Sequence, residues 1–175
     1  MSRRVLVAGI GNIFLADDGF GSEVARALAR QPLPQGTRVV DYGIRGMHLA
    51  YDLLEGYDAL VIIDTVPGRG TPGELLVLEV GAQDLGAQDL GAGELDPHGM
   101  APAAVLASLS TLGGALPRTF VVGCAPQSTD EGMGLSPAVQ AAVRPACVAV
   151  QELLERELAS CGVAPGSPLA AGKEN

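Results

Sequence analysis

Short, nearly all-apolar runs along this chain alternate with segments whose apolar residues recur every three or four positions. Such runs are typical of parallel strands buried on both faces of a sheet, and the wider spacing is typical of amphipathic helices. We expect strands over residues 5–8, 38–42, 59–64 and 118–124. Helices are predicted from Phe20, over 47–54, through Val105 and Leu109, and from Pro137 onward with Ser136 as its N-cap.

One further strand is predicted to run against the others. The connection at 65–73 is too short for the crossover that a parallel partner requires, so residues 74–80 should pair antiparallel at a sheet edge. The element order predicts an α/β three-layer sandwich: a mostly parallel five-stranded sheet with one antiparallel edge strand and helices on both faces. We assign residues 1–162 to a single α/β domain and 163–175, which lacks periodicity, to a flexible C-terminal tail.

Two features interrupt this regular pattern. Pro145 lies inside the apolar stripe of the last helix and is expected to kink that helix or split it in two. The tandem GAQDL of residues 81–90 is too short for a solenoid and is interpreted as an elaborated surface loop.

Composition narrows the classes of partner. The formal net charge is -9, which argues against binding to a nucleic-acid backbone or an anionic membrane surface. The N-terminus lacks the pattern of a signal peptide, and no apolar run is long enough for a membrane span. The 3 cysteines form no closely spaced pair, which suits a reducing compartment, so we expect a cytoplasmic protein.

The stretch GIGNIFLADDGFG, from Gly9 to Gly21, allows two opposing interpretations. A glycine-rich turn between a strand and a helix suggests a phosphate cradle, but Phe14 stands where a dinucleotide fingerprint needs its third glycine. Asp17 and Asp18 at the helix start would repel an anion. The sequence therefore favours a site that attracts cations, and nucleotide binding is disfavoured.

Asp18, Asp64 and His98 are the candidate ligands. Asp18 follows the first strand and Asp64 ends the central one, and the carboxyl ends of parallel strands share one edge of the sheet. The 17 residues of 81–97 can span about 50 Å, enough to bring His98 to that edge. Two carboxylates and an imidazole would suit zinc, nickel or a similar divalent ion.

Plainer interpretations of the same residues stay open. Asp17 or Asp18 can be a helix N-cap, and we expect Asp17 to be the cap and Asp18 the ligand. Asp64 can start a turn, and His98 can be an ordinary loop residue. Cys124, at a strand end with no base assigned beside it, is expected to be a small core residue.

Four motifs in order resemble the hydrogenase maturation endopeptidases: GIGNIFLADDGFG, LVIIDTV followed by GTPGELLVLE, DPHGMAPAAVL, and GLSPAV, together spanning about residues 5–158. The resemblance implies a protease that removes a C-terminal extension from the large-subunit precursor of a nickel–iron hydrogenase after nickel insertion. It also implies metal-binding and catalytic roles for Asp18, where some members have Glu, and for Asp64 and His98. Nickel would come with the precursor, because three ligands on two loops and a strand end make a loose site; other divalent ions would substitute in vitro.

Further expectations concern partners. The loop GIRGMH should open on the same edge, and we place substrate contacts at Gly43, Arg45 and Gly46. The expected partner is the hydrogenase large-subunit precursor, with no nucleic acid and no membrane, and the protein is expected to be a monomer. The alternative function is a non-catalytic metal-binding or assembly factor that uses the same three ligands.

Overall fold

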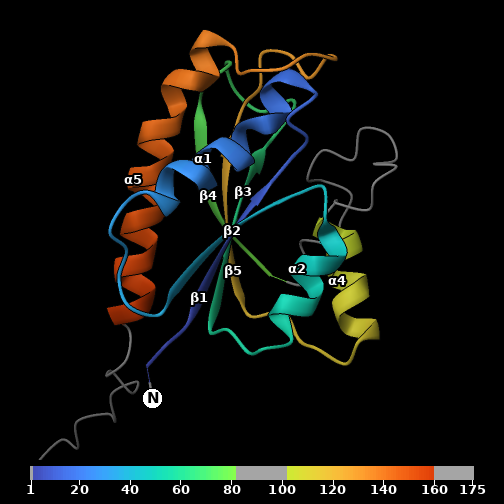
Figure 1. The fold of residues 1–175 in the computed structure, drawn as a ribbon, viewed down its shortest axis with the longest axis vertical. Coiled ribbons are helices and arrows are strands. Elements are labelled where there is room, and N and C mark those ends of the chain that lie inside the picture. Colours follow the sequence, from blue (N-terminus) through green and yellow to red (C-terminus); the bar gives the residue numbers. More distant parts are fainter. Residues whose placement is uncertain (1, 82–101, 160–175) are drawn as a thin grey trace, which may run out of the picture.

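The computed structural model describes residues 2–81 and 102–159, and these contain one five-stranded sheet. Its strand order is β2 (Thr37–Gly43), β1 (Val5–Ile10), β3 (Ala59–Thr65), β5 (Arg118–Cys124) and β4 (Leu75–Val80) (Figure 1). The first four are mutually parallel, and β4 pairs antiparallel with β5. The predicted antiparallel edge strand is therefore confirmed. Its direction has a physical reason, since the connection from β3 to β4 is too short for the crossover that a parallel partner requires.

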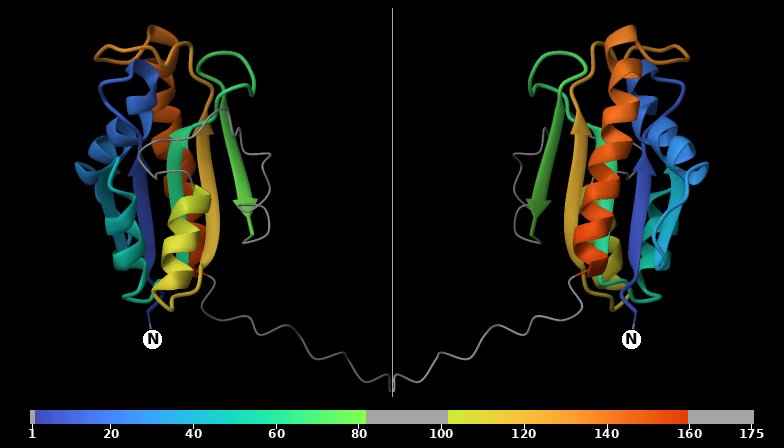
Figure 2. Two further views of the ribbon diagram at one scale, coloured as in Figure 1. Left: turned by 90° about the vertical axis from the view of Figure 1, so that its right-hand side faces the viewer. Right: turned by 90° about the vertical axis from the view of Figure 1, so that its left-hand side faces the viewer.

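Helices cover both faces of this sheet (Figure 2). A short 3-10 helix, η1 (Ala16–Gly19), leads into α1 (Phe20–Ala29), which lies on one face beside the long α5 (Pro137–Ala159). The opposite face carries α2 (Gly46–Leu53) and α4 (Pro102–Thr111), which contact each other. The three-layer α/β sandwich predicted from the sequence is thus confirmed. None of the helices in the described ranges is long and apolar enough to cross a membrane.

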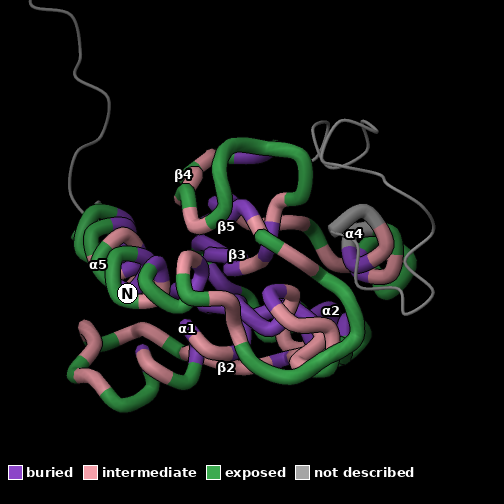
Figure 3. Tube along the Cα trace, turned by 90° about the horizontal axis from the view of Figure 1, so that it is seen from above, coloured by how far each residue is buried: buried purple, intermediate pink, exposed green. Residues whose placement is uncertain are grey.

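The two faces divide the strand residues by strict alternation. Val5 and Val7 of β1 pack with α1 and α5, whereas Leu6 and Ala8 pack with α2 and α4. Because successive strand side chains point to opposite faces, a strand between two helical layers has to be apolar at nearly every position. All six residues of β1 are buried, and the inner strands β3 and β5 lie in the buried centre seen from above in Figure 3, whereas the edge strands β2 and β4 are partly exposed.

Of the two outcomes expected at Pro145, a kink or a split, the split does not occur. The helix α5 continues from Pro137 to Ala159 with Pro145 inside it. Proline removes one helical hydrogen bond, to the carbonyl of Ala141, and both residues lie on the exposed side where water can replace that bond. The buried side keeps Ala142 and Ala146 against the sheet, so tertiary packing outweighs the local defect.

Several predictions fall outside the described residues. The repeated GAQDL segment beyond Gly81, the position of His98, and the proposed boundary between the domain and a tail at 163–175 all lie there.

Candidate active site

The turn after β1 is built on close backbone packing. A side chain on Gly21 would collide with the carbonyl oxygens of Ile10 and Ile63, at the ends of β1 and β3. Gly11 has a φ of +140°, and a side chain there would collide with the carbonyl of Asp18. These glycines therefore let the start of α1 lie directly against two strand ends and let the turn close on itself. That role requires no phosphate.

Asp18 is fixed by two donors from different segments. Its Oδ2 accepts a hydrogen bond from the backbone N–H of Asn12 at 2.8 Å, and its Oδ1 accepts one from the hydroxyl of Thr65 at 3.0 Å. The first bond closes the turn of residues 11–18, and the second ties that turn to the end of β3. Asp18 is half-buried at the carboxyl edge of the sheet.

Asp64 lies at the same edge, as the second-last residue of β3. Its Oδ1 accepts the backbone N–H of Thr65 at 2.7 Å, and its side chain is half-buried. Thr65 thus donates to both carboxylates, through its N–H to Asp64 and through its hydroxyl to Asp18. The structure brings together the two acids that the sequence predicted to be neighbours.

Asp17 has a different role from its neighbour and from the one we expected. Neither η1 nor α1 has a side-chain N-cap, so the predicted capping by Asp17 or Asp18 is wrong. Asp17 is fully buried and instead accepts backbone N–H groups of Gln127, Ser128 and Ser136, and the Ser136 hydroxyl, at 2.6–3.2 Å. The carboxylate oxygens of Asp17 are therefore engaged by a distant segment of the chain and not by the start of its own helix.

The electrostatics of Asp17 follow from this environment. Burial pushes the pKa of this carboxyl upward, but the three backbone donors and the Ser136 hydroxyl outweigh burial, and the pKa lies below its ordinary value. Asp17 therefore stays ionised and ties the turn carrying Asp18 to the segment that precedes α5. The same two segments also exchange backbone hydrogen bonds between Phe14, Ala16 and Gly132.

Within residues 2–81 and 102–159, no group of three or more His, Cys, Asp or Glu side chains is placed to hold a metal ion. Of the three predicted ligands, Asp18 and Asp64 lie within the described residues. His98, the predicted third ligand, lies outside the described residues. The role of all three as ligands stays a prediction.

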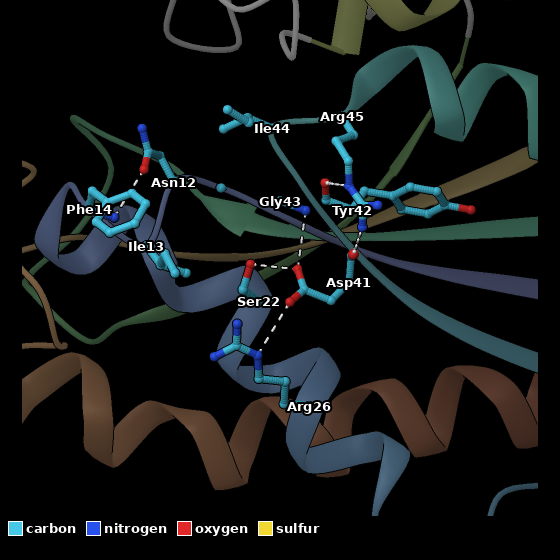
Figure 4. Close-up of a pocket in the computed structure, with 11 residues that line it drawn as sticks. Asn12, Ile13, Phe14, Ser22, Arg26, Asp41, Tyr42, Gly43, Ile44 and Arg45 are labelled. Carbon is cyan, nitrogen blue, oxygen red and sulfur yellow. Dashed lines mark hydrogen bonds and ion pairs between the residues drawn. The ribbon is translucent and has the colours of Figure 1, made fainter.

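The predicted substrate loop borders a cavity of about 230 Å³. Gly43 and Arg45 line this cavity from the segment after β2, and Asn12 and Phe14 line it from the turn after β1 (Figure 4). Gly46 begins α2 just behind the loop and does not line the cavity. The loop therefore opens beside the turn that carries Asp18, as the shared sheet edge predicted.

A polar cluster between β2 and α1 supports this loop. Asp41 accepts hydrogen bonds from the Ser22 hydroxyl at 2.7 Å and from the Gly43 N–H at 3.1 Å, and it pairs with Arg26 at 3.3 Å (Figure 4). Arg45 donates to the backbone carbonyls of Asp41 and Tyr42. The guanidinium of Arg45 thus braces its own loop.

Sequence reasoning missed Asp41, although a signal was present. Asp41 is an acid near the carboxyl end of a parallel strand, the same pattern that singled out Asp64. An irregularity in the pairing of β1 with β2 falls beside it: Gly9 pairs with Asp41, whereas Ile10 pairs with Gly43. Bulges of this kind are common next to functional sites, where they redirect the chain. Thr65 was also missed, since a threonine at a strand end has no distinctive pattern.

Two apolar side chains at the cavity are exposed to solvent. Phe14, from the turn after β1, is 59% exposed, and Ile44, from the loop after β2, is 44% exposed (Figure 4). Exposed apolar residues gathered at a hollow indicate a surface that contacts another molecule.

Cys124 is excluded as a nucleophile. It is fully buried at the end of β5, and burial, together with the nearby charge of Asp17, raises the pKa of its thiol to about 11. A thiol in that state carries almost no thiolate at neutral pH. The interpretation of Cys124 as a small core residue agrees with its burial.

Known proteins match both the sequence and the fold. A sequence model of the hydrogenase maturation protease family matches residues 22–153. The Hydrogenase 2 maturation protease of Escherichia coli strain K12 is 33% identical over 145 residues, which is 82% of this chain and 85% of that protein. The solved structure of the hydrogenase maturating endopeptidase HybD from E. coli superimposes with a TM-score of 0.74 at 31% identity, over 87% of this chain and 93% of that one.

A more distant solved structure agrees. The [NiFe] hydrogenase maturation protease HybD from Thermococcus kodakarensis has a TM-score of 0.65 at 27% identity, over 86% of this chain and 99% of that one. The matched range 22–153 covers most of the sandwich, and the two superpositions each cover more than four fifths of this chain. This chain belongs to the hydrogenase maturation protease family.

Proposed function

We propose that this protein is the endopeptidase that removes a C-terminal extension from the large-subunit precursor of a nickel–iron hydrogenase after nickel insertion. The observation that carries the proposal is the pair of carboxylates, Asp18 and Asp64, held at one sheet edge by donors of the same residue, Thr65. Family membership supplies the protease class, and the names of the E. coli and T. kodakarensis relatives support the hydrogenase precursor as substrate.

In this proposal the nickel ion is part of the substrate. Asp18 and Asp64 contact the nickel already installed in the precursor, with His98 as the third ligand. A precursor without nickel offers these carboxylates nothing to bind, so the attraction between the site and its substrate depends on completed metal insertion. Cleavage then acts as a checkpoint for nickel loading, and the reaction takes place in the cytoplasm.

Two chemical routes are available once the precursor is held. The substrate nickel can polarise the scissile carbonyl or a water molecule, or a carboxylate such as Asp18 can act as the general base that deprotonates the attacking water. Both routes need the water and the carbonyl beside Asp18, at the turn that Asp17 fixes in place.

The cavity next to this turn receives the precursor polypeptide in our proposal. A volume of about 230 Å³ lies below the roughly 300–1,000 Å³ typical of small-molecule sites, which favours a side chain of a bound polypeptide. Phe14 and Ile44 supply apolar contact at its rim, the main chain at Gly43 lines it with Arg45 bracing the loop, and Gly46 follows just behind at the start of α2. In this proposal the substrate lies between the β1 turn and the β2 loop.

Mass spectrometry of the precursor tests this function. Nickel-loaded and nickel-free precursor are incubated with the protein, and the mass of each large subunit is measured. The expected result is loss of a C-terminal peptide from the nickel-loaded precursor alone. Stable binding of the loaded precursor without any mass change would instead identify a non-catalytic assembly factor.

A further inference from the structure

We propose that Thr65 is a positioning residue for this cleavage reaction, because its hydroxyl fixes the orientation in which the Asp18 carboxylate meets the substrate nickel. The inference rests on the proposed function, since it assigns a purpose to a contact of a predicted nickel-binding group. Thr65 itself touches neither the nickel nor the scissile bond in this account.

The geometry makes Thr65 the link between the two acids. It is only 8% exposed, at the last position of β3, where its backbone pairs with Cys124 of β5. Sheet pairing therefore fixes its main chain. From this fixed position the hydroxyl reaches the Oδ1 of Asp18 at 3.0 Å, and the N–H reaches the Oδ1 of Asp64 at 2.7 Å. An ionised carboxylate only accepts hydrogen bonds, so the hydroxyl of Thr65 is the donor.

Asp18 needs the hydrogen bond from Thr65 because its own segment is not part of the sheet. It belongs to the four-residue 3-10 helix η1, in a turn that pairs with neither β1 nor β3 as a strand. The N–H of Asn12 holds one carboxylate oxygen, and the carboxylate can still rotate about that single anchor. The hydroxyl of Thr65 holds the other oxygen and fixes the plane of the group. One donor on each oxygen leaves each a second lone pair that can face a cation.

The expected size of the effect follows from comparable supports elsewhere. Residues that orient metal-contacting groups typically change metal affinity or activity by about 10–100-fold when their hydrogen bond is removed. Substitution of Thr65 can remove only the hydrogen bond to Asp18, because the donor to Asp64 is a backbone N–H. The proposal therefore predicts a partial loss, smaller than that caused by replacing Asp18 itself.

Three variants separate positioning from packing. Thr65→Val keeps the shape of the side chain and removes the hydroxyl, and Thr65→Ser keeps the hydroxyl and removes a methyl group. The matched control is Thr119→Val at another buried threonine, whose hydroxyl donates to the Pro117 carbonyl at 2.8 Å near the opposite end of β5. Cleavage of nickel-loaded precursor is measured under single-turnover conditions for each variant, together with its Tm.

Thr65→Val is expected to cleave about 10–100-fold more slowly than the wild-type protein. Thr65→Ser should recover most of the rate, and Thr119→Val should cleave at the wild-type rate even if its Tm falls as far as that of Thr65→Val. Wild-type cleavage by Thr65→Val, or equal loss in the Val and Ser variants, would overturn the inference. If the Val variant does not fold, Thr65→Ala, which also lacks the hydroxyl, takes its place in the comparison with Ser.

Asp18→Asn and Asp64→Asn, assayed in the same experiment, separate the inference about Thr65 from the proposed function on which it rests. If both abolish cleavage while Thr65→Val is fully active, the proposed function stands and the role of Thr65 is wrong. If both cleave normally, the site assignment of the proposed function is itself wrong.

Discussion

The buried carboxylate of Asp17 offers the clearest quantitative prediction about stability. Four donors converge on it: the backbone N–H groups of Gln127, Ser128 and Ser136, and the Ser136 hydroxyl. Three of them reach Oδ2, and only the Ser136 N–H reaches Oδ1. In Asp17→Asn the amide oxygen can take the Oδ2 position, but the NH2 group then faces the Ser136 N–H as a second donor. The substitution therefore leaves one donor unpaired in a buried position and replaces three hydrogen bonds to a charged group by neutral ones.

The magnitude follows from the cost of each lost bond. Hydrogen bonds to charged groups contribute about 1.5–3 kcal/mol each and neutral ones about 0.5–1.5 kcal/mol, so losing one bond and weakening three by about 1 kcal/mol each lowers the free energy of unfolding by about 4–6 kcal/mol. For a chain of this size each kcal/mol corresponds to about 2–4 °C, so Tm should fall by about 8–24 °C. Asp130→Asn, an exposed acid in the same segment, is the matched control and should leave Tm within about 1 °C of the wild-type value.

The dependence on pH gives the same prediction a second signature. The pKa of Asp17 is lower in the folded protein than the value of about 3.9 expected for an unfolded chain. Its stabilisation is therefore fully present well above that value and is lost as pH falls through the folded pKa. The Tm difference between wild-type protein and Asp17→Asn should be constant between about pH 6 and 8 and should narrow below about pH 4. Equal Tm values at neutral pH, or a difference that does not narrow in acid, would refute this reasoning.

Three further predictions concern other parts of the fold. Glu157 is fully buried and pairs with Arg118 at 3.3 Å, so Glu157→Gln should lower the free energy of unfolding by about 3 kcal/mol, measured by denaturant titration. Gly21→Ala should displace α1 from the strand ends and abolish cleavage, whereas Gly56→Ala, with open space around it, should cost only about 1–2 kcal/mol and leave cleavage intact. Cys124, with a pKa raised to about 11, should resist iodoacetamide at neutral pH until the protein is unfolded, as followed by mass spectrometry.

Each of these three predictions would be contradicted by a specific result. Glu79→Gln removes the exposed partner of the same arginine and should have a much smaller effect than Glu157→Gln; equal effects would mean that burial is not the cause. Normal cleavage and stability in Gly21→Ala would show that the close approach is not required. Rapid labelling of Cys124 in the folded protein would contradict its burial.

The sheet could be predicted from the sequence because the apolar pattern of each short segment depends on which of its faces are buried. The run of residues 59–63 is apolar on both faces because helices cover both faces, and the short connection to β4 permits only antiparallel pairing. The last helix shows the limit of local rules. Pro145 predicts a kink or a split from its position alone, but whether the helix continues depends on the packing of many buried residues of α5 against the sheet, which a single position does not reveal.

The site was predictable only to the level of sheet edges. The rule that parallel strands end on one edge brought Asp18 and Asp64 together correctly. It could not assign Asp17, whose partners lie about 110–120 positions away in sequence, at Gln127, Ser128 and Ser136. The same holds for Thr65, since its contact with Asp18 spans 47 positions and depends on how closely the glycine turn approaches β3. Tertiary hydrogen bonds of this kind leave no periodic pattern.

The central claim is that Asp18 and Asp64 recognise nickel carried by the precursor, and one measurement tests it most directly. Wild-type protein and Asp64→Asn are each mixed with nickel-loaded and with nickel-free precursor, and the mass of the large subunit is followed over time. The account predicts a truncated subunit only when wild-type protein meets the nickel-loaded precursor, while both proteins keep similar Tm values. Truncation of the nickel-free precursor, or cleavage by folded Asp64→Asn at the wild-type rate, would contradict it.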